Sequence, residues 1–181
     1  MSDSKPHPYV TERTKMWRGR DIKPHFLETI EKIEQFGCYN LSVFSNSGEL
    51  GFTYSTGIYD SSGKPEIITV GLPPDTAHHA ILYAFELMES GNDLTTGRHL
   101  DLIKNVECEF RAVDPKWLHH TMLRTDWYYE GANVPVLQLV YPDLENRFEG
   151  DAAFNDFFAQ PNLGLEAPLG RLEIGLWSMT K

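Results

Sequence analysis

The sequence predicts a single α+β domain, in which a mainly antiparallel sheet packs against two or three helices. Three observations support this class. Segments with period-two alternation recur and are separated by turn residues, two further segments have helical periodicity, and no linker or repeat divides the 181 residues. A chain of this length suits one sizeable core. We expect a polar, loose N-terminal arm over residues 1–20 and one domain over residues 21–181.

The first helix is expected over residues 24–36. Its apolar residues recur at helical spacing, Pro24 suits a first helical position, and Gly37 follows as a stop signal. A hairpin comes next, because residues 39–43 and 50–56 alternate on either side of the turn signal at residues 46–48.

A central strand is expected after a second turn at residues 61–63. Residues 67–70 form a continuous apolar and β-branched run, which is typical of a strand buried on both faces. The clearest helix of the chain then spans about residues 75–90. One stripe of it carries its apolar residues, and Gly91 ends it. The stripe consists of Ala77, Ile81, Phe85 and Met88.

The remaining elements are shorter. Residues 92–104 are expected to be irregular, and Asp114 is a capping residue that opens a short helix to about Trp127. The tail from residue 142 to residue 170 should wrap the surface while it buries the rings of Phe154, Phe157 and Phe158. Further strands are expected over residues 106–112, 134–141 and, at an edge, 172–176.

Composition narrows the classes of function. A net charge of −10 disfavours nucleic-acid binding, which needs a basic face to neutralise phosphates, and is compatible with a basic partner. No apolar run approaches the length of a membrane span, and the polar N-terminus does not resemble a signal peptide. The two cysteines, Cys38 and Cys108, are expected to be buried free thiols. Together these features predict a cytoplasmic protein.

A set of ordered motifs resembles the bacterial family known as domain of unknown function 4262, over about residues 24–165. The set departs from the family pattern where Tyr141 replaces a tryptophan and where residues 146–150 replace a Gly-Arg-Phe-Pro-Trp run. The family implies no reaction and no cofactor, and a more distant likeness points to suppressor-of-fused-like and immunity domains. The motifs are Tyr54-Ser-Thr-Gly57, Pro65-Glu66, Gly71-Leu72-Pro73, Gly91, Leu137-Gln138, Tyr141-Pro142-Asp143 and Gln160-Pro-Asn-Leu-Gly164.

Metal ligation is not indicated. His78 and His79 share one helix, and His119 and His120 share another. Adjacent helical residues point too far apart to bind one ion, so a zinc site would need one histidine from each helix plus a carboxylate or thiolate. We expect His78 to be a structural histidine and His79 to be solvated. Sequence motifs for a nucleophile, a Walker loop or a dinucleotide site are absent, so we expect no cofactor.

Polar side chains in otherwise apolar strands suggest a site. Glu66 and Asp143 flank buried runs. Burial would raise the pKa of Glu66, and a raised pKa would suit acid–base catalysis. Alternatively, both carboxylates accept hydrogen bonds from backbone amides in their turns. Gln138 either ties strands together or faces a cavity. Aromatic side chains could wall a ligand or simply fill the core, and hydroxyls beside Gly57 could hold an anion. The candidate ligand-binding residues are Tyr54, Thr56, Glu66, Gln138, Tyr141 and Asp143.

Three functions remain open. The first is a non-catalytic binding module, immunity-like or regulatory, for another bacterial protein or a small polar ligand. The second is a small enzyme or ligand-binding domain, with Tyr54, Glu66, Gln138 and Asp143 converging on one face or end of the sheet. The third is a flavin-binding split barrel, which only the run of antiparallel strands favours. The candidate residues accept more hydrogen bonds than they donate, so we expect a neutral or cationic ligand or a peptide rather than a nucleotide.

Overall fold

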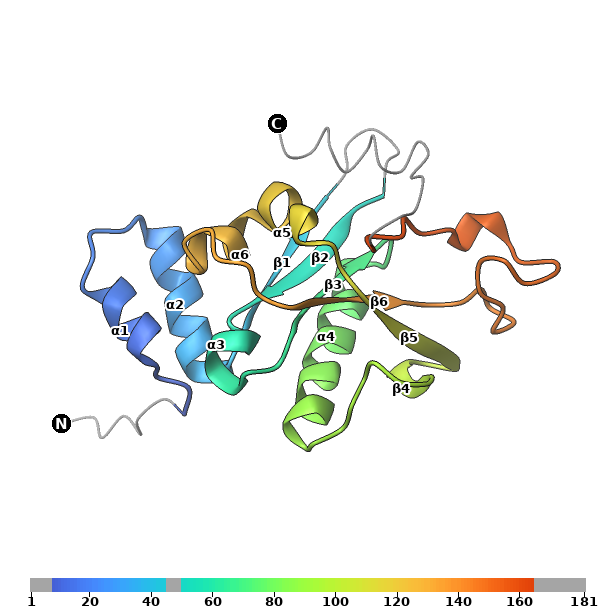
Figure 1. The fold of residues 1–181 in the computed structure, drawn as a ribbon, viewed down its shortest axis with the longest axis horizontal. Helices are drawn as coiled ribbons and strands as arrows, with labels where there is room; N and C mark the ends of the chain where they lie inside the picture. The colour runs from blue at the N-terminus through green and yellow to red at the C-terminus, as the bar shows by residue number, and fades with distance from the viewer. Residues whose placement is uncertain (1–7, 45–49, 165–181) are drawn as a thin grey trace.

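One six-stranded sheet organises the molecule. In the computed structural model, which describes residues 8–44 and 50–164, the strand order is β1-β2-β3-β6-β5-β4 (Figure 1). Neighbouring strands are antiparallel except β3 and β6, which are parallel. The predicted α+β class is confirmed. The strands are Tyr39–Val43 (β1), Phe52–Thr56 (β2), Glu66–Val70 (β3), His99–Ile103 (β4), Val106–Ala112 (β5) and Val136–Val140 (β6).

The helices are more numerous than expected. The described residues contain six α-helices and a short 3-10 helix at Asp156–Phe158, where the sequence predicts two or three helices. Four of the six have only 5 to 7 residues, too few for helical periodicity to stand out. The α-helices are Glu12–Arg18 (α1), Pro24–Phe36 (α2), Ile58–Ser62 (α3), Pro74–Glu89 (α4), Pro115–Thr121 (α5) and Leu123–Tyr128 (α6).

Two apolar cores lie on opposite faces of the sheet. Successive side chains of a strand point to opposite faces, so β3 contributes Ile68 to one core and Ile67 to the other. Helices α1, α2, α5 and α6 cover the first face, and α4 covers the second (Figure 1). All residues of β3 are buried, as the apolar run at residues 67–70 predicts, and all residues of β2 and β6 are buried as well.

Helix α1 corrects the expected N-terminal arm. The side chain of Thr11 caps the helix, and Trp17 is 5% exposed and donates from Nε1 to the carbonyl of Tyr128 at 3.1 Å. The ring of Trp17 also lies 4.3 Å from that of Trp127. A buried aromatic side chain therefore helps to fix a segment that is otherwise polar. Residues 1–7 of the predicted arm lie outside the described residues.

Three other segments differ from expectation. Strand β4 occupies part of the stretch predicted to be irregular. Its register against β5 is shifted and Asp101 has a φ of 73°, so its apolar and polar side chains do not alternate as in a regular strand. Helix α3 replaces the turn expected at residues 61–63. The single helix expected after Asp114 is divided at Met122, whose ψ of 59° is not helical.

The tail is packed less fully than predicted. Phe157 is 83% exposed, and Phe154 and Phe158 are only half-buried. The edge strand expected at residues 172–176 lies outside the described residues. The predictions for α4 and the cysteines are confirmed, since the four stripe residues are buried and both thiols are buried and free.

Candidate functional site

The structure does not gather the predicted site residues into one site, although Gln138 and Tyr141 line the same small pocket. Glu66 is the first residue of β3, and Asp143 follows the last residue of β6 by three positions. Because β3 and β6 run parallel, the two carboxylates lie at opposite ends of the sheet. The prediction that Tyr54, Glu66, Gln138 and Asp143 converge is therefore wrong, and each of these residues bonds within the fold.

Glu66 is completely buried and is held by four hydrogen-bond donors. Its Oε1 accepts from the amides of Gly57 at 2.8 Å and Tyr59 at 3.1 Å and from the hydroxyl of Tyr129 at 2.6 Å. Its Oε2 accepts from the hydroxyl of Ser55 at 2.5 Å. Glu66 thus joins β3 to the turn after β2 and to the end of α6. None of these donors is a charged side chain.

Burial raises the pKa of Glu66 above its ordinary value, and the four hydrogen bonds oppose this shift in part. A raised pKa means that the folded state holds the proton more tightly than the unfolded state. The contribution of Glu66 to stability is therefore fully present below its unfolded pKa and is lost as pH rises through its folded pKa.

The raised pKa of Glu66 predicts how stability depends on pH. We expect the free energy of unfolding of the wild type to fall relative to that of Glu66→Gln as pH rises from about 4 to about 8, because the amide does not titrate. Urea unfolding of both proteins across this range measures the difference, and other titrating groups cancel. A difference that moves the opposite way would mean that the hydrogen bonds outweigh the cost of burial.

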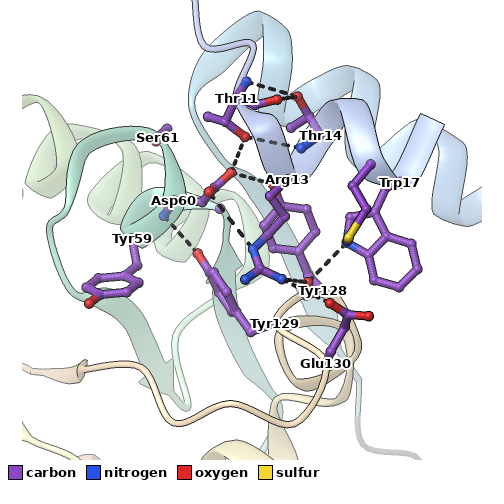
Figure 2. A network of polar contacts seen from close by, with 12 residues as sticks. Thr11, Arg13, Thr14, Trp17, Tyr59, Asp60, Ser61, Tyr128, Tyr129 and Glu130 are labelled. Atoms are coloured by element: carbon purple, nitrogen blue, oxygen red, sulfur yellow. Dashed lines mark hydrogen bonds and ion pairs between the residues drawn. The ribbon is translucent and has the colours of Figure 1, made fainter. Parts of the chain in front are cut away.

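A second polar network lies beside Glu66 and joins α1, α3 and the end of α6 (Figure 2). Asp60 accepts from the hydroxyls of Thr11 at 2.5 Å and Tyr128 at 2.8 Å, and Arg13 Nε lies 4.0 Å from its carboxylate. The amide of Asp60 donates to the hydroxyl of Tyr129, which in turn donates to Glu66. These contacts anchor the N-terminal helix.

Gln138 and Tyr141 fasten the tail and a neighbouring strand. The amide nitrogen of Gln138 donates to the carbonyl of Pro161 at 2.7 Å, and its oxygen accepts from the amide of Leu163 at 2.9 Å. The hydroxyl of Tyr141 donates to the carbonyl of Val70 at 2.9 Å. Gln138 therefore ties segments together, and it also lines a small pocket of about 10 Å³.

Asp143 organises the turn after β6. Its carboxylate accepts from the amides of Glu145, Arg147 and Asn155 and from Arg147 Nε at 2.9 Å. Desolvation alone would raise the pKa of Asp143, but these hydrogen bonds outweigh it and lower the pKa to about 2. This carboxylate is a structural acceptor, ionised at neutral pH.

The last two candidate residues also have internal partners. The hydroxyl of Tyr54 accepts from the amide of Arg124 at 3.1 Å, and burial raises the pKa of Tyr54 to about 12. The hydroxyl of Thr56 pairs with that of Thr125 at 2.8 Å. A ligand-binding role for these residues stays a prediction.

A cavity lined mainly by aromatic rings and carboxylates lies elsewhere, between α2, α4 and the start of β1. We call it the α2–α4 cavity. It has a volume of about 400 Å³, with a floor that is buried or half-buried and a rim that is exposed. The floor is formed by Tyr9, Cys38, Tyr39, Asn40, Leu82 and Phe85, and the rim by Lys32, Phe36, His78, Glu86 and Glu89.

Aromatic rings and carboxylates dominate this cavity. Tyr9 packs on Phe85 with ring centroids 6.2 Å apart, and its hydroxyl donates to Glu89 at 3.0 Å. Gly37 makes this packing possible, because it has a φ of +82° and a Cβ there would lie 2.7 Å from the ring of Phe85. The ammonium of Lys32 lies 5.4 Å from the centroid of the Phe36 ring.

The electrostatics of the cavity favour positive charge. Desolvation lowers the pKa of His78, so its imidazole is neutral at pH 7. The exposed position of His78 also corrects the prediction that it is a structural histidine. Two carboxylates and one ammonium then leave one net negative charge on the rim. Aromatic faces and carboxylates together are the groups that bind organic cations.

A second cavity of about 240 Å³ lies between α2, α6 and the β1–β2 hairpin; we call it the α2–α6 cavity. Phe26 stacks on Trp127 with centroids 4.1 Å apart, and the guanidinium of Arg124 lies 4.6 Å from the Phe26 ring. The lining is apolar except for Thr121, Arg124 and the hydroxyl of Tyr54. The apolar lining residues are Phe26, Leu41, Val43, Phe52, Leu123 and Trp127.

Metal ligation and membrane insertion find no support in the described residues. No group of three or more His, Cys, Asp or Glu side chains within residues 8–44 and 50–164 is arranged to hold a metal ion. In that same part of the chain, no helix is both long and apolar enough to cross a bilayer.

The fold defines a single-domain α+β protein, and the comparisons place it in a family. Residues 32–155 match the family model described as Domain of unknown function (DUF4262), and the chain belongs to that family. This confirms the resemblance found in the sequence. No curated protein and no solved structure matches the chain.

Sequence reasoning missed the residues of the α2–α4 cavity. Glu86 and Glu89 are three positions apart and therefore share a face of α4, which was a readable signal. Phe36 is 50% exposed at the end of α2, which the structure reveals and the sequence does not. Tyr9 gives no such signal, because it stands in a polar segment and meets α4 only through tertiary folding.

Proposed function

We propose that this protein is a non-catalytic binding module and that the α2–α4 cavity binds a cationic group, such as a primary amine or a basic side chain. The observation that carries the proposal is the joint lining of one cavity by aromatic rings and by Glu86 and Glu89. Ligand sites combine an apolar floor with a few polar groups that orient the ligand, and this cavity has that composition.

The predicted preference for a cationic ligand over a nucleotide applies to this cavity too. Among the described residues that line it, Lys32 is the only lysine or arginine and shares the rim with two carboxylates, so a phosphate would meet net repulsion. An alkylammonium instead has aromatic faces for its chain and carboxylates for its charge. The proposal retains the predicted binding module and moves its site away from Tyr54, Glu66, Gln138 and Asp143.

A paired carboxylate substitution tests the proposal. Nα-acetyl-lysine amide is expected to bind the wild type, and Glu86→Gln combined with Glu89→Gln is expected to weaken binding about tenfold, since each exposed ion pair contributes up to about 1 kcal/mol. Calorimetric titration measures both affinities. ATP is expected not to bind.

The control is Glu28→Gln, which removes an exposed carboxylate of α2 that lines neither cavity. This variant should bind the amine as the wild type does. If the control and the double variant lose the same amount of affinity for the amine, the effect comes from the net charge of the protein and not from the cavity. Binding of ATP with no binding of the amine would contradict the proposal.

A further inference from the structure

Strand β1 has an unpaired edge beside the α2–α4 cavity. It is the first strand of the sheet order and pairs with β2 on one side only. No other strand in the described part of the chain lies against its second side. All five of its residues are only half-buried, whereas every residue of β2 is buried. An unpaired edge of this kind offers a row of backbone donors and acceptors to an incoming chain.

The two cavities flank this edge strand. Asn40 lines the α2–α4 cavity together with Tyr39 at the start of the strand, and Leu41 and Val43 line the α2–α6 cavity. Consecutive strand residues point to opposite faces of a sheet, so the cavities open on the two faces at the same edge. A strand added beside β1 would present its own side chains to the two cavities in alternation.

We infer that an extended peptide segment of a partner protein binds by adding a strand to β1, with a basic side chain in the α2–α4 cavity and apolar neighbours in the α2–α6 cavity. This inference rests on the proposed function and names its ligand. Main-chain hydrogen bonds to a sheet edge supply affinity in this mode, and pockets for alternate side chains supply specificity.

The chemistry of each cavity determines which side chain of the bound peptide it accepts. The rim of the α2–α4 cavity carries net negative charge through Glu86 and Glu89, which fits lysine or arginine. The α2–α6 cavity is lined mainly by aromatic and aliphatic side chains, which fits leucine. Five residues of β1 at about 3.4 Å each span roughly 17 Å, so five peptide residues cover the edge.

The side chain of Asn40 also favours an incoming chain. Both of its polar atoms are buried, and neither has a hydrogen-bond partner among the described residues. Buried amide groups without partners are uncommon in folded proteins. A peptide backbone alongside β1 would bring donors and acceptors into the neighbourhood of this amide.

A second copy of the chain is a less suitable occupant of the edge. Each copy carries a net charge of −10, and a symmetric pairing of β1 with β1 would bring two acidic rims together. Sedimentation velocity distinguishes the two occupants. Dimers that dissociate when peptide is added would overturn the assignment to a partner peptide.

Two peptides of equal composition test the inference. In acetyl-Thr-Leu-Lys-Leu-Thr-amide, the lysine and the leucines point to opposite faces of a strand. In acetyl-Leu-Thr-Lys-Thr-Leu-amide, all three point to the same face. The first peptide is expected to bind at least tenfold more tightly than the second and than Nα-acetyl-lysine amide. Equal affinities for the two peptides would overturn the inference.

Backbone methylation tests strand pairing directly. Successive residues of a strand direct their amide groups to opposite sides. N-methylation at the lysine, or instead at the leucines, should abolish binding in one case and spare it in the other. If neither methylation weakens binding, strand addition is wrong, while binding of the amine by the α2–α4 cavity remains supported.

A variant in each cavity separates the inference from the proposed function. Leu123→Ala alters a half-exposed residue of the α2–α6 cavity and is expected to weaken binding of the first peptide but not of Nα-acetyl-lysine amide. The double variant at Glu86 and Glu89 should weaken both. Unchanged peptide binding in Leu123→Ala would contradict the role given to the α2–α6 cavity.

Discussion

Replacing Glu66 by alanine is expected to lower the free energy of unfolding by about 3–5 kcal/mol. The substitution leaves four donors without an acceptor, namely two backbone amides, one of them only partly buried, and the buried hydroxyls of Ser55 and Tyr129. It also opens space at the junction of β3, α3 and the end of α6. Relief from burying a charge offsets only part of this loss.

Glu66→Gln is the matched control. Its amide oxygen keeps an acceptor for the three donors that now reach Oε1, and its amide nitrogen can donate to the hydroxyl of Ser55. Urea unfolding of the three proteins at pH 7 measures the effect, and the glutamine variant should lose far less than the alanine variant. Equal loss in both would show that the charge, rather than the hydrogen bonds, stabilises this junction.

Phe85→Ala is expected to cost about 3–5 kcal/mol of unfolding free energy, the usual range for deleting a buried ring. Phe85 is 3% exposed and belongs to the core between α4 and the sheet. It also supports Tyr9 in the floor of the α2–α4 cavity. We therefore expect this variant to lose amine binding together with stability.

Phe157→Ala is the control, because it deletes the same ring from a position that is 83% exposed. Its unfolding free energy should change by less than about 0.5 kcal/mol. Thermal or urea unfolding of both variants gives the comparison. An unchanged melting temperature for Phe85→Ala would refute the packing assigned to α4.

Local periodicity explains which elements the sequence predicts well. Helices α2 and α4 have apolar stripes and clear boundary residues, and their observed bounds agree with expectation to within about a residue. Helices α1 and α3 have 7 and 5 residues, so no stripe can repeat within them. Their positions depend on tertiary contacts, such as the burial of Trp17 and the bonds made by Asp60.

The candidate site was harder to predict than the fold. The sequence identifies Glu66 and Gln138 correctly as polar residues that need partners, but it does not reveal that β3 and β6 are parallel neighbours. That pairing sends Glu66 and Asp143 to opposite ends of the sheet. The α2–α4 cavity joins Tyr9, Phe36 and Glu86, which are distant in sequence, so no local pattern could define it.

Binding of a cation in the α2–α4 cavity is tested most directly by an NMR titration of the ¹⁵N-labelled protein with Nα-acetyl-lysine amide. We predict saturable shifts of the backbone amides of Tyr39, Asn40 and Glu86, with little change at Gln138 and Asp143. No saturable shift at the first three, or the largest shifts at Gln138 and Asp143, would contradict the proposed site.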